Sequence, residues 1–403
     1  MAQALSSSFT RLPTAPTICS FASAVSAMDN GWDIFCKVVD NFGDAGVTWR
    51  LARQLAHEHG LQVRLWIDNL GAFARLCPEA DLHRAQQTLE GVLVCRWPEH
   101  WVDTPVASVV IEAFGCTLPA QYEAALANRL QPACWINLEY LSAEPWVGGC
   151  HGLPSMKSGG VRKFFFFPGF RPDTGGLLRE QGLLETREVL QGSAKARTAF
   201  LNSIGVHPAD TACLVSLFAY ENGGLGGWFD QMAAGPSPVH VLVPEGRVLA
   251  SVQAWAGQTL TQGQLFTRGA LQVQVLPFLS QPAYDQLLWA CDFNAVRGED
   301  SFVRAQWAAR PLLWHIYQQD EYAHWEKLEA FLALYTQALP TAAAEALCAV
   351  WRAWNMDGDM GAAWAGLMPY WQMLAAHARN WCTELAARPD LATALVQFRR
   401  NSL

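Results

Sequence analysis

The sequence predicts an α/β protein built from two doubly wound, mainly parallel sheets that face a central crevice, with a helical C-terminal tail. From Trp32 onward, short apolar runs typical of buried strands alternate with stretches in which apolar residues have helical spacing. A cluster of Pro and Gly at 168–176 interrupts this alternation, and the pattern then starts again. From Glu321 the sequence is helical almost to its end.

The first half of the chain contains five predicted strands with helices between them. The strand runs, in chain order, are 32–39, 63–67, 106–114, 133–140 and 163–170. Helical spacing is found at 47–59 and 120–128. Strand runs of this apolar kind predict a parallel sheet that helices cover on both faces.

The second half repeats this arrangement. Its predicted strands are 213–220, 239–245, 271–278, 291–296 and 311–317, and its predicted helices lie at about 226–234, 246–256, 281–290 and 301–310. In doubly wound folds, ligands bind in the crevice at the carboxyl ends of the strands. Functional residues are therefore expected in the loops at 40–46, 220–224, 277–282 and 297–301.

These patterns divide the chain into four parts. They are a leader at 1–30, an N-terminal domain at 31–180, a C-terminal domain at 181–375, and helices at 376–403 that are expected to pack back on the N-terminal domain. The leader is rich in Ser, Thr and Ala but lacks the strong apolar segment of a signal peptide, so a floppy leader is favoured over export. Met28 is an alternative start.

The composition disfavours several classes of protein. The 403 residues suffice for two or three domains, and 18 Trp with only 16% charged residues indicate a large core and aromatic-lined clefts. The net charge of −8, without a basic run, argues against a nucleic-acid partner. No apolar stretch is long enough for a membrane-spanning helix. The eleven Cys form no metal-binding motif, and their wide spacing indicates a reduced, cytoplasmic protein.

The loop after the first predicted strand carries two carboxylates, Asp40 and Asp44, with Gly43 between them. One acid can face a substrate, which Gly43 allows to approach the backbone, while the other supports the loop or the next helix. The alternative is that Asp40 caps a turn and Asp44 caps the helix. The loop lacks the G-x-G-x-x-G pattern, which argues against a dinucleotide site.

The loop at 297–301 opens a predicted helix and allows two interpretations. Either Asp300 or Ser301 caps the helix, or the Ser301 hydroxyl and the first N–H groups of the helix hold a phosphate. In the second case Glu299 faces the crevice beside that phosphate.

The loop at 277–282 offers an aromatic ring, Phe278, and an amide, Gln281, both suited to a nucleobase. The alternative is that Phe278 is a core residue.

The segment Asp357-Gly358-Asp359 matches the D-x-D pattern that holds a divalent ion in one class of glycosyltransferases. Because it lies between two helical stretches and not at a strand end, a turn between helices is favoured. The sequence contains no H-E-x-x-H, G-x-S-x-G or G-x-x-x-x-G-K-[ST] motif, which argues against hydrolases of those types and against P-loop nucleotidases.

Four segments resemble the EarP family of bacterial protein-arginine rhamnosyltransferases, which modify translation elongation factor P. They are WDIFCKVVDNFGDAGVTWRLARQLA at 32–56, the region 164–180 with FFFFPGF and TGGLLRE, SLFAYEN at 216–222, and RGEDSFVRAQWAARPLLWHIYQQDEYAHWEKLEAFL at 297–332. The similarity extends from about Trp32 to the C-terminus.

The resemblance implies an inverting GT-B glycosyltransferase with two Rossmann-like domains. Such an enzyme moves L-rhamnose from dTDP-β-L-rhamnose to one arginine of elongation factor P, without metal or other cofactor. The modified factor is then active in rescuing ribosomes stalled at polyproline. The expected partners are the factor and dTDP-rhamnose, with no nucleic acid and no membrane, and the expected location is the cytoplasm.

The resemblance also implies roles for individual residues. Asp40 and Glu299 match the catalytic carboxylates of the family, with Asp44 in a supporting role. The expected donor-binding residues are Gly43, Tyr220, Phe278, Gln281, Tyr284, Asp300 and Ser301. The last two and Tyr220 match diphosphate contacts, and the residues at 278, 281 and 284 match thymidine contacts.

The chemistry of these residues is consistent with that reaction. A guanidinium group has a pKa above about 12, so a base cannot simply deprotonate it beforehand. Carboxylates from facing domains can instead accept its N–H groups, orient one nitrogen and take the proton as the new bond forms. The alternatives are a GT-B transferase with another nucleotide sugar or a small-molecule acceptor, and a non-catalytic nucleotide-sugar-binding protein.

Overall fold

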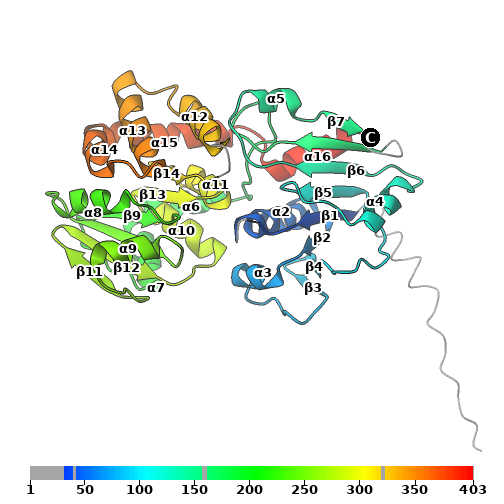
Figure 1. Ribbon diagram of the computed structural model, residues 1–403, viewed down its shortest axis with the longest axis horizontal. Helices are drawn as coiled ribbons and strands as arrows, with labels where there is room; N and C mark the ends of the chain where they lie inside the picture. Colours follow the sequence, from blue (N-terminus) through cyan, green and yellow to red (C-terminus); the bar gives the residue numbers. More distant parts are fainter. Residues whose placement is uncertain (1–30, 40–41, 157–160, 319–322, 403) are drawn as a thin grey trace, which may run out of the picture.

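The computed structural model describes residues 31–39, 42–156, 161–318 and 323–402, and the leader predicted at 1–30 lies outside this part of the chain. The described residues form two lobes that lie side by side (Figure 1). Each lobe is a sheet with helices against its faces, as the sequence predicts.

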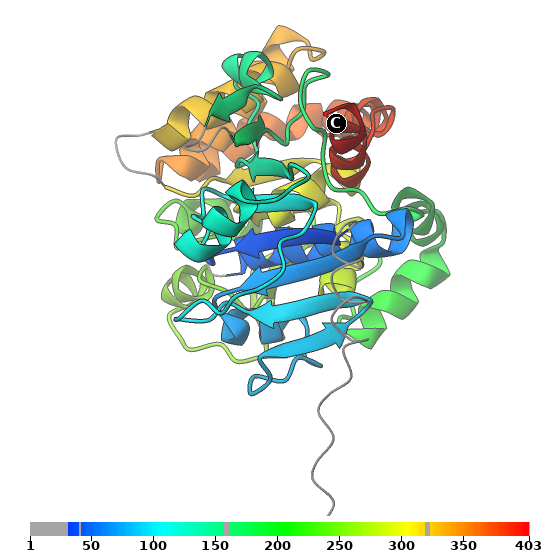
Figure 2. The same cartoon turned by 90° about the vertical axis from the view of Figure 1, so that its right-hand side faces the viewer.

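The N-terminal sheet has eight strands in the order β3-β4-β2-β1-β5-β6-β8-β7. The strands are β1 (Gly31–Cys36), β2 (Gln62–Ile67), β3 (Gln86–Leu89), β4 (Val92–Arg96), β5 (Val109–Ala113), β6 (Cys134–Leu138), β7 (Pro154–Met156) and β8 (Arg162–Phe166). Neighbours from β4 to β8 pair in parallel, whereas β3 and β7 are antiparallel edge strands. Figure 2 views the molecule from this lobe, with the twisted sheet in front.

Helices cover both faces of this sheet. They are α2 (Gly43–His59), α3 (Leu70–Leu76), α4 (Ala120–Ala127) and α5 (Trp146–Cys150). Successive strand side chains point to opposite faces. Ile34 of β1 therefore shares a core with Trp49 of α2, and the next residue, Phe35, shares a separate core with Tyr122 of α4.

The C-terminal sheet has six strands in the order β11-β12-β10-β9-β13-β14, with β11 as an antiparallel edge strand. The strands are β9 (Cys213–Leu217), β10 (Val239–Pro244), β11 (Leu265–Arg268), β12 (Leu271–Leu276), β13 (Phe293–Arg297) and β14 (Leu312–His315). The surrounding helices are α6 (Leu183–Gly192), α7 (Ala194–Ser203), α8 (Leu225–Ala233), α9 (Leu249–Ala256), α10 (Gln281–Ala290) and α11 (Asp300–Trp307).

The tail is helical, as predicted, and it contacts both lobes. It comprises α12 (Ala323–Tyr335), α13 (Thr341–Asn355), α14 (Met360–Leu367), a 3₁₀ turn (Met368–Tyr370), α15 (Trp371–Ala386) and α16 (Leu391–Asn401). Trp381 of α15 belongs to the core of the C-terminal lobe, whereas Leu391 and Leu395 of α16 belong to a core of the N-terminal lobe. None of the described helices is both long and apolar enough to span a membrane.

All ten predicted strands are present, but several predicted runs continue past the end of the strand. The strand ends at Cys36 in the run 32–39, at Leu217 in the run 213–220 and at Leu276 in the run 271–278. The surplus residues lie in loops at the carboxyl ends of the sheets.

Four of the described strands were not predicted, β3, β4, β7 and β11, and three of them belong to two tight hairpins. β3 and β4 are joined by Glu90 and Gly91, both with positive φ (43° and 75°), and β11 and β12 are joined by Gly269 (φ 57°) and Ala270. Both hairpins add a short, partly exposed edge strand to a parallel sheet. A search for long apolar runs misses such strands because only one of their faces is buried.

The D-x-D segment forms a turn between α13 and α14, as predicted. Asp359 caps α14 by accepting the N–H of Ala362 at 2.9 Å, and Asp357 accepts the N–H of Gly223 at 2.8 Å. Both carboxylates therefore have structural hydrogen bonds.

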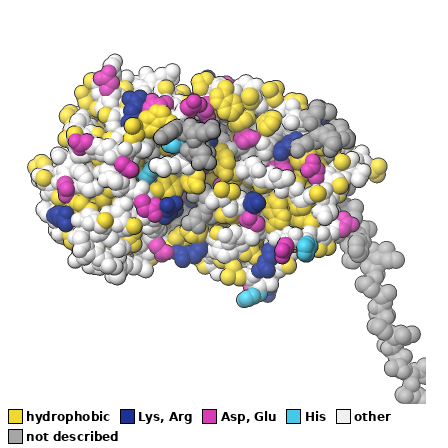
Figure 3. Space-filling model, in the orientation of Figure 1, with side chains coloured by type: hydrophobic (Ala, Val, Ile, Leu, Met, Phe, Trp, Pro, Cys, Tyr) yellow, Lys and Arg dark blue, Asp and Glu magenta, His cyan; other side chains and the backbone are white. Residues whose placement is uncertain are grey.

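Charged side chains of both signs are scattered over the face of the molecule that Figure 3 shows, with apolar atoms between them. No broad patch of a single sign is visible on that face among the described residues.

Candidate active site

Two of the cavities between the lobes are each lined by several residues of the loops that the sequence analysis identified. The first, here called the Phe278 cavity, has a volume of about 90 Å³, and the second, the Tyr140 cavity, about 150 Å³. Gly43, Gly298 and Glu299 line both cavities, so the two spaces adjoin at these residues.

The Phe278 cavity is formed mainly by the carboxyl ends of β9, β12 and β13 and the starts of α10 and α11. The ring of Phe278 lies 5.4 Å from that of Phe42 of the other lobe, and the Arg75 guanidinium lies 4.7 Å from its centroid. Phe278 is half-buried and lines the cavity. The alternative that it is a core residue is therefore wrong.

Gln281 and Tyr284 lie one turn apart at the start of α10, and both line the Phe278 cavity. The Tyr284 ring packs edge-on against Phe218 at 5.5 Å. Gln281 is buried, and its Nε2 donates to the carbonyl of Gly46 at 3.1 Å while its Oε1 accepts from Arg53 at 2.9 Å. Helix α2 of the opposite lobe thus fixes the orientation of this amide.

The start of α11 follows β13 directly, through Gly298 in a left-handed conformation (φ 60°). Glu299 is the N-cap residue, so neither Asp300 nor Ser301 occupies the cap position that one interpretation gave them. The Ser301 hydroxyl donates to the carbonyl of Arg297 and accepts the Arg297 N–H at 3.1 Å. Ser301 therefore closes the turn between strand and helix and also lines the Phe278 cavity.

Several residues that line this cavity were not predicted as site residues, and Phe218 and Arg297 are two of them. The Arg297 guanidinium lies 4.7 Å from the ring centroids of both Phe218 and Tyr220. Tyr220, which was predicted to contact the donor, lines neither of the two cavities, and its ring packs against the Arg297 guanidinium. The signal available in the sequence was position, because these side chains lie at or just after the carboxyl ends of β9 and β13.

On the Tyr220 ring also packs His315, with the two ring centroids 5.2 Å apart. Burial lowers the pKa of His315 to about 4. The imidazole is therefore neutral at physiological pH and adds no positive charge beside the arginine.

The Tyr140 cavity draws its lining from both lobes. Tyr140 stacks on Phe114 with ring centroids 5.0 Å apart, and the ammonium group of Lys327 lies 5.6 Å from the Tyr140 centroid. Both carboxylate oxygens of Glu299 lie 3.1 Å from the N–H of Leu141 and accept it. Glu299, which comes from the C-terminal lobe, is thereby held against the loop that follows β6.

Asp44 lies in the first turn of α2, is buried and lines the Tyr140 cavity. Its Oδ2 accepts the N–H of Val39 at 2.8 Å. This bond connects the segment after β1 to α2 across the loop, in agreement with a supporting role. Asp40, the predicted catalytic carboxylate, lies outside the described residues.

Asp300 pairs with Arg50 of α2, with 3.0 Å between Oδ1 and Nε. Arginines thus balance the carboxylates near the start of α11. In the described part of the chain, no three His, Cys, Asp or Glu side chains are grouped so that they could hold a metal ion.

Comparison with known proteins finds relatives along almost the whole chain. Residues 32–400 match the family model of the elongation factor P (EF-P) rhamnosyltransferase EarP. The protein-arginine rhamnosyltransferase of Pseudomonas putida is 61% identical over 92% of this chain and 99% of its own length, and that of Pseudomonas aeruginosa is 56% identical over 91% and 98%. A solved structure that explains EarP-mediated arginine glycosylation of translation elongation factor EF-P is 47% identical, has a TM-score of 0.68, and covers 93% of this chain and 99% of that chain.

Proposed function

This chain belongs to the EarP family of elongation factor P rhamnosyltransferases, and on that premise we propose that it moves L-rhamnose from dTDP-β-L-rhamnose to an arginine of elongation factor P. It is a protein-arginine rhamnosyltransferase with the GT-B arrangement of two facing lobes. In this proposal the transfer inverts the anomeric carbon and requires no metal. It takes place in the cytoplasm, and the modified factor acts on ribosomes stalled at polyproline.

The observation that carries the proposal is the arrangement of the two cavities. A transferase that joins a nucleotide sugar to a protein side chain needs two binding spaces that meet at the reacting atoms. The Phe278 and Tyr140 cavities adjoin at Gly43, Gly298 and Glu299, which include one of the two predicted catalytic carboxylates. We assign the first cavity to the donor and the second to the acceptor arginine.

The donor assignment rests on the lining of the Phe278 cavity. Phe278 and Tyr284 supply aromatic faces for the base, and Gln281 supplies an amide that can pair with its edge. At the other end, Ser301 and the start of α11 offer the first N–H groups of a helix, which suit a diphosphate. Arg297 adds a fixed positive charge that can stabilise the leaving dTDP in place of a metal ion.

The acceptor assignment rests on the lining of the Tyr140 cavity. The stacked rings of Phe114 and Tyr140 can pack against the planar guanidinium and its aliphatic stem. Glu299 lies at the inner end, next to the donor cavity, where its carboxylate can accept guanidinium N–H groups.

The reaction then needs one base and one leaving group. A guanidinium nitrogen attacks the anomeric carbon as the bond from that carbon to the dTDP oxygen breaks, and the leaving dTDP takes the bonding electron pair. Asp40 accepts the proton that the nitrogen loses, and Glu299 holds the guanidinium in line. Asp44 accepts the N–H of Val39, the residue that precedes Asp40 in the chain, and in this proposal it has the supporting role.

The test is direct. The protein is incubated with elongation factor P and dTDP-β-L-rhamnose, and the intact mass of the factor is measured. The expected result is a gain of one deoxyhexose, located on an arginine by fragmentation. Parallel reactions contain dTDP-glucose or UDP-glucose in place of the donor, or the protein with Asp40→Asn.

Three other outcomes would contradict the proposal. Equal transfer from a second nucleotide sugar would make the donor assignment wrong. Transfer only to small molecules would make the acceptor assignment wrong. Binding of dTDP without any transfer by the unmodified enzyme would indicate a nucleotide-sugar-binding protein.

A further inference from the structure

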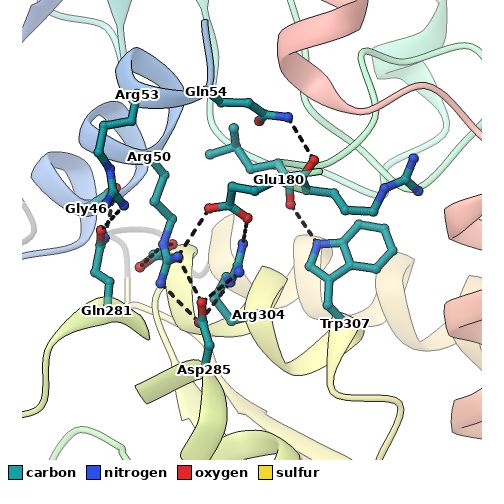
Figure 4. Close-up of polar contacts among 12 residues, drawn as sticks. Gly46, Arg50, Arg53, Gln54, Glu180, Gln281, Asp285, Arg304 and Trp307 are labelled. Carbon is teal, nitrogen blue, oxygen red and sulfur yellow. Dashed lines mark hydrogen bonds and ion pairs between the residues drawn. The ribbon is translucent and has the colours of Figure 1, made fainter. Parts of the chain in front are cut away.

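Arg50, in the middle of α2, forms ion pairs with three carboxylates that belong to other parts of the fold (Figure 4). Its guanidinium nitrogens lie 3.0 and 3.1 Å from the two oxygens of Asp285 in α10 and 3.3 Å from Glu180. Its Nε lies 3.0 Å from Asp300 at the start of α11. The side chain of Arg50 is only 3% exposed, so water does little to screen these pairs.

A second buried arginine, Arg304 of α11, shares two of these partners. It lies 2.9 and 2.7 Å from Asp285 and 2.6 Å from Glu180. Burial by itself raises the pKa of the Glu180 carboxyl, but Arg304 and Arg50 outweigh that effect and lower the pKa to about 2. Within the described chain, Arg50 is the member of this arginine pair that reaches Asp300.

The segment that joins the two lobes is held at the same place. Gln54 of α2 donates to the carbonyl of Arg179 at 2.8 Å, and Trp307 of α11 donates to that of Leu178 at 2.7 Å (Figure 4). Glu180 is the next residue and pairs with both arginines. One helix from each lobe therefore donates a hydrogen bond to the backbone of the connecting segment.

Helix α2 also approaches two expected donor-binding residues very closely, through a position without a side chain. A Cβ at Gly46 would lie 3.2 Å from Oδ2 of Asp300 and 3.3 Å from Nε2 of Gln281. Gly46 is one turn before Arg50 on the same helix. One face of α2 therefore fixes Asp300 by charge and Gln281 by a hydrogen bond to the backbone.

We infer that Arg50 is a positioning residue for the donor site and that it acts on the donor through Asp300. By pairing with Asp300 from the opposite lobe, Arg50 neutralises a carboxylate that would otherwise repel a diphosphate at the start of α11. This ion pair also fixes the first residue of α11 relative to α2, the helix that comes shortly after Asp40 in the sequence. This role rests on the proposed function, because it presumes that a nucleoside diphosphate binds beside Asp300.

Arginine suits this task and lysine does not. A planar guanidinium can pair with Asp285 through two nitrogens while its Nε faces Asp300, whereas an ammonium is a single point charge on a flexible stem. Arg50→Lys keeps the charge of the network but loses this geometry.

The matched experiment compares Arg50→Lys with Arg304→Lys. Both residues are buried and both pair with Asp285 and Glu180, so loss of the network should lower the melting temperature of both variants. Only Arg50→Lys is expected to raise the Kd for dTDP and the KM for dTDP-rhamnose, by roughly 10-fold, since a bond to a charged group is lost. Calorimetry with dTDP and initial rates measure these quantities.

A double-mutant cycle tests whether the effect passes through Asp300. If it does, Arg50→Lys should change the Kd for dTDP by less than about twofold when Asp300→Asn is already present. A full additional loss of affinity in the Asp300→Asn background would mean that Arg50 acts on the donor directly, and would overturn the inference.

Gly46→Ala provides a test that leaves every charge in place. Replacing Gly by Ala within a helix normally stabilises it. The new Cβ would nevertheless displace Asp300 or Gln281, so donor KM should rise while the melting temperature stays the same or increases. Unchanged dTDP affinity in both Gly46→Ala and Arg50→Lys would mean that the network stabilises the fold and has no role in donor binding.

The wild-type measurements separate this inference from the proposed function. If the unmodified enzyme fails to bind dTDP, the donor assignment is wrong and the role of Arg50 falls with it. If the unmodified enzyme binds dTDP and transfers rhamnose while the variants match it, only the role of Arg50 is wrong.

Discussion

The described part of the chain has two buried groupings of arginine with carboxylate, and they differ in where they lie. Inside the N-terminal lobe, Arg64 of β2 pairs with Asp33 of β1 through two bonds of 2.5 Å, and the hydroxyl of Tyr122 donates to the same carboxylate. Between the lobes, Arg50 and Arg304 pair with carboxylates of two helices and of the connecting segment. Asp33 is fully buried, as deeply as any member of the second group.

Burial of a carboxylate and its pairing with arginine do not by themselves indicate function. The grouping around Asp33 has one cation and one anion, joins elements of a single lobe, and lines neither cavity. The interlobe network has two cations and three anions, and two of its members, Arg50 and Asp300, line the Phe278 cavity. Both groupings consist of buried arginines paired with carboxylates. They differ in their position relative to the Phe278 and Tyr140 cavities.

The sharpest test of this contrast compares the loss of a proposed catalytic carboxylate, Asp40, with the loss of a carboxylate inside the N-terminal lobe, Asp33. Asp40→Asn should reduce the transfer rate by about 10²–10⁴-fold, because the amide cannot accept the guanidinium proton. Binding of dTDP and the melting temperature should remain close to those of the wild type. Rates are measured by rhamnosylation of elongation factor P, and turnover near the wild-type value would remove Asp40 from the mechanism.

Asp33→Asn makes the same chemical change in β1, inside the N-terminal lobe. It leaves Arg64 buried without a compensating charge, so the free energy of unfolding should fall by about 3–5 kcal/mol. Urea unfolding measures this loss. The Kd for dTDP of the folded fraction should not change, and a weakened dTDP affinity would show that the two groupings are not as separate as their positions indicate.

Ser301→Ala should have an intermediate effect. If the hydroxyl contacts the diphosphate, its loss should raise the Kd for dTDP by a factor of about 5 to 150, the equivalent of roughly 1–3 kcal/mol. Because the hydroxyl also bonds to the backbone of Arg297, the melting temperature should fall as well.

Ser280→Ala is the matched control for Ser301→Ala. Ser280 caps α10 through the N–H of Ala283 at 3.4 Å and is exposed. Its loss should lower stability by about 1 kcal/mol and leave dTDP binding unchanged. If calorimetry shows unchanged dTDP affinity for Ser301→Ala as well as for Ser280→Ala, the Ser301 hydroxyl only stabilises the turn between β13 and α11.

The smallest effects are expected at the D-x-D turn and on chelation of metal. Asp359→Ala removes a helix cap and should cost about 0.5–2 kcal/mol of stability without changing the transfer rate. EDTA should leave the transfer rate unchanged, since Arg297 and the first N–H groups of α11 are proposed to stabilise the negative charge of the leaving dTDP. Activity that is lost with EDTA and restored by magnesium or manganese would overturn the metal-free mechanism.

Much of the fold follows from local sequence. Each predicted strand coincides with an apolar run, because a strand buried on both faces requires apolar side chains at successive positions. The runs that continue past their strands do so for a related reason. Phe218 comes directly after β9, and Phe278 comes two residues after β12. Both are apolar and line the crevice, so one apolar run contains the strand and the site residue that follows it.

The positions of three crevice loops, at 40–46, 277–282 and 297–301, were also predictable from the sequence, because parallel strands bring their carboxyl ends to one edge. The fourth predicted loop, at 220–224, lines neither cavity. The contacts that join the two lobes could not be predicted from the sequence and are seen in the folded structure. Arg50 is 130 residues from Glu180, 235 from Asp285 and 250 from Asp300, and nothing near any of them in sequence marks these pairings. Apolar periodicity is a property of residues that are close in the sequence. The neutralisation of a buried charge depends instead on which distant side chains the packing of the two lobes brings into contact.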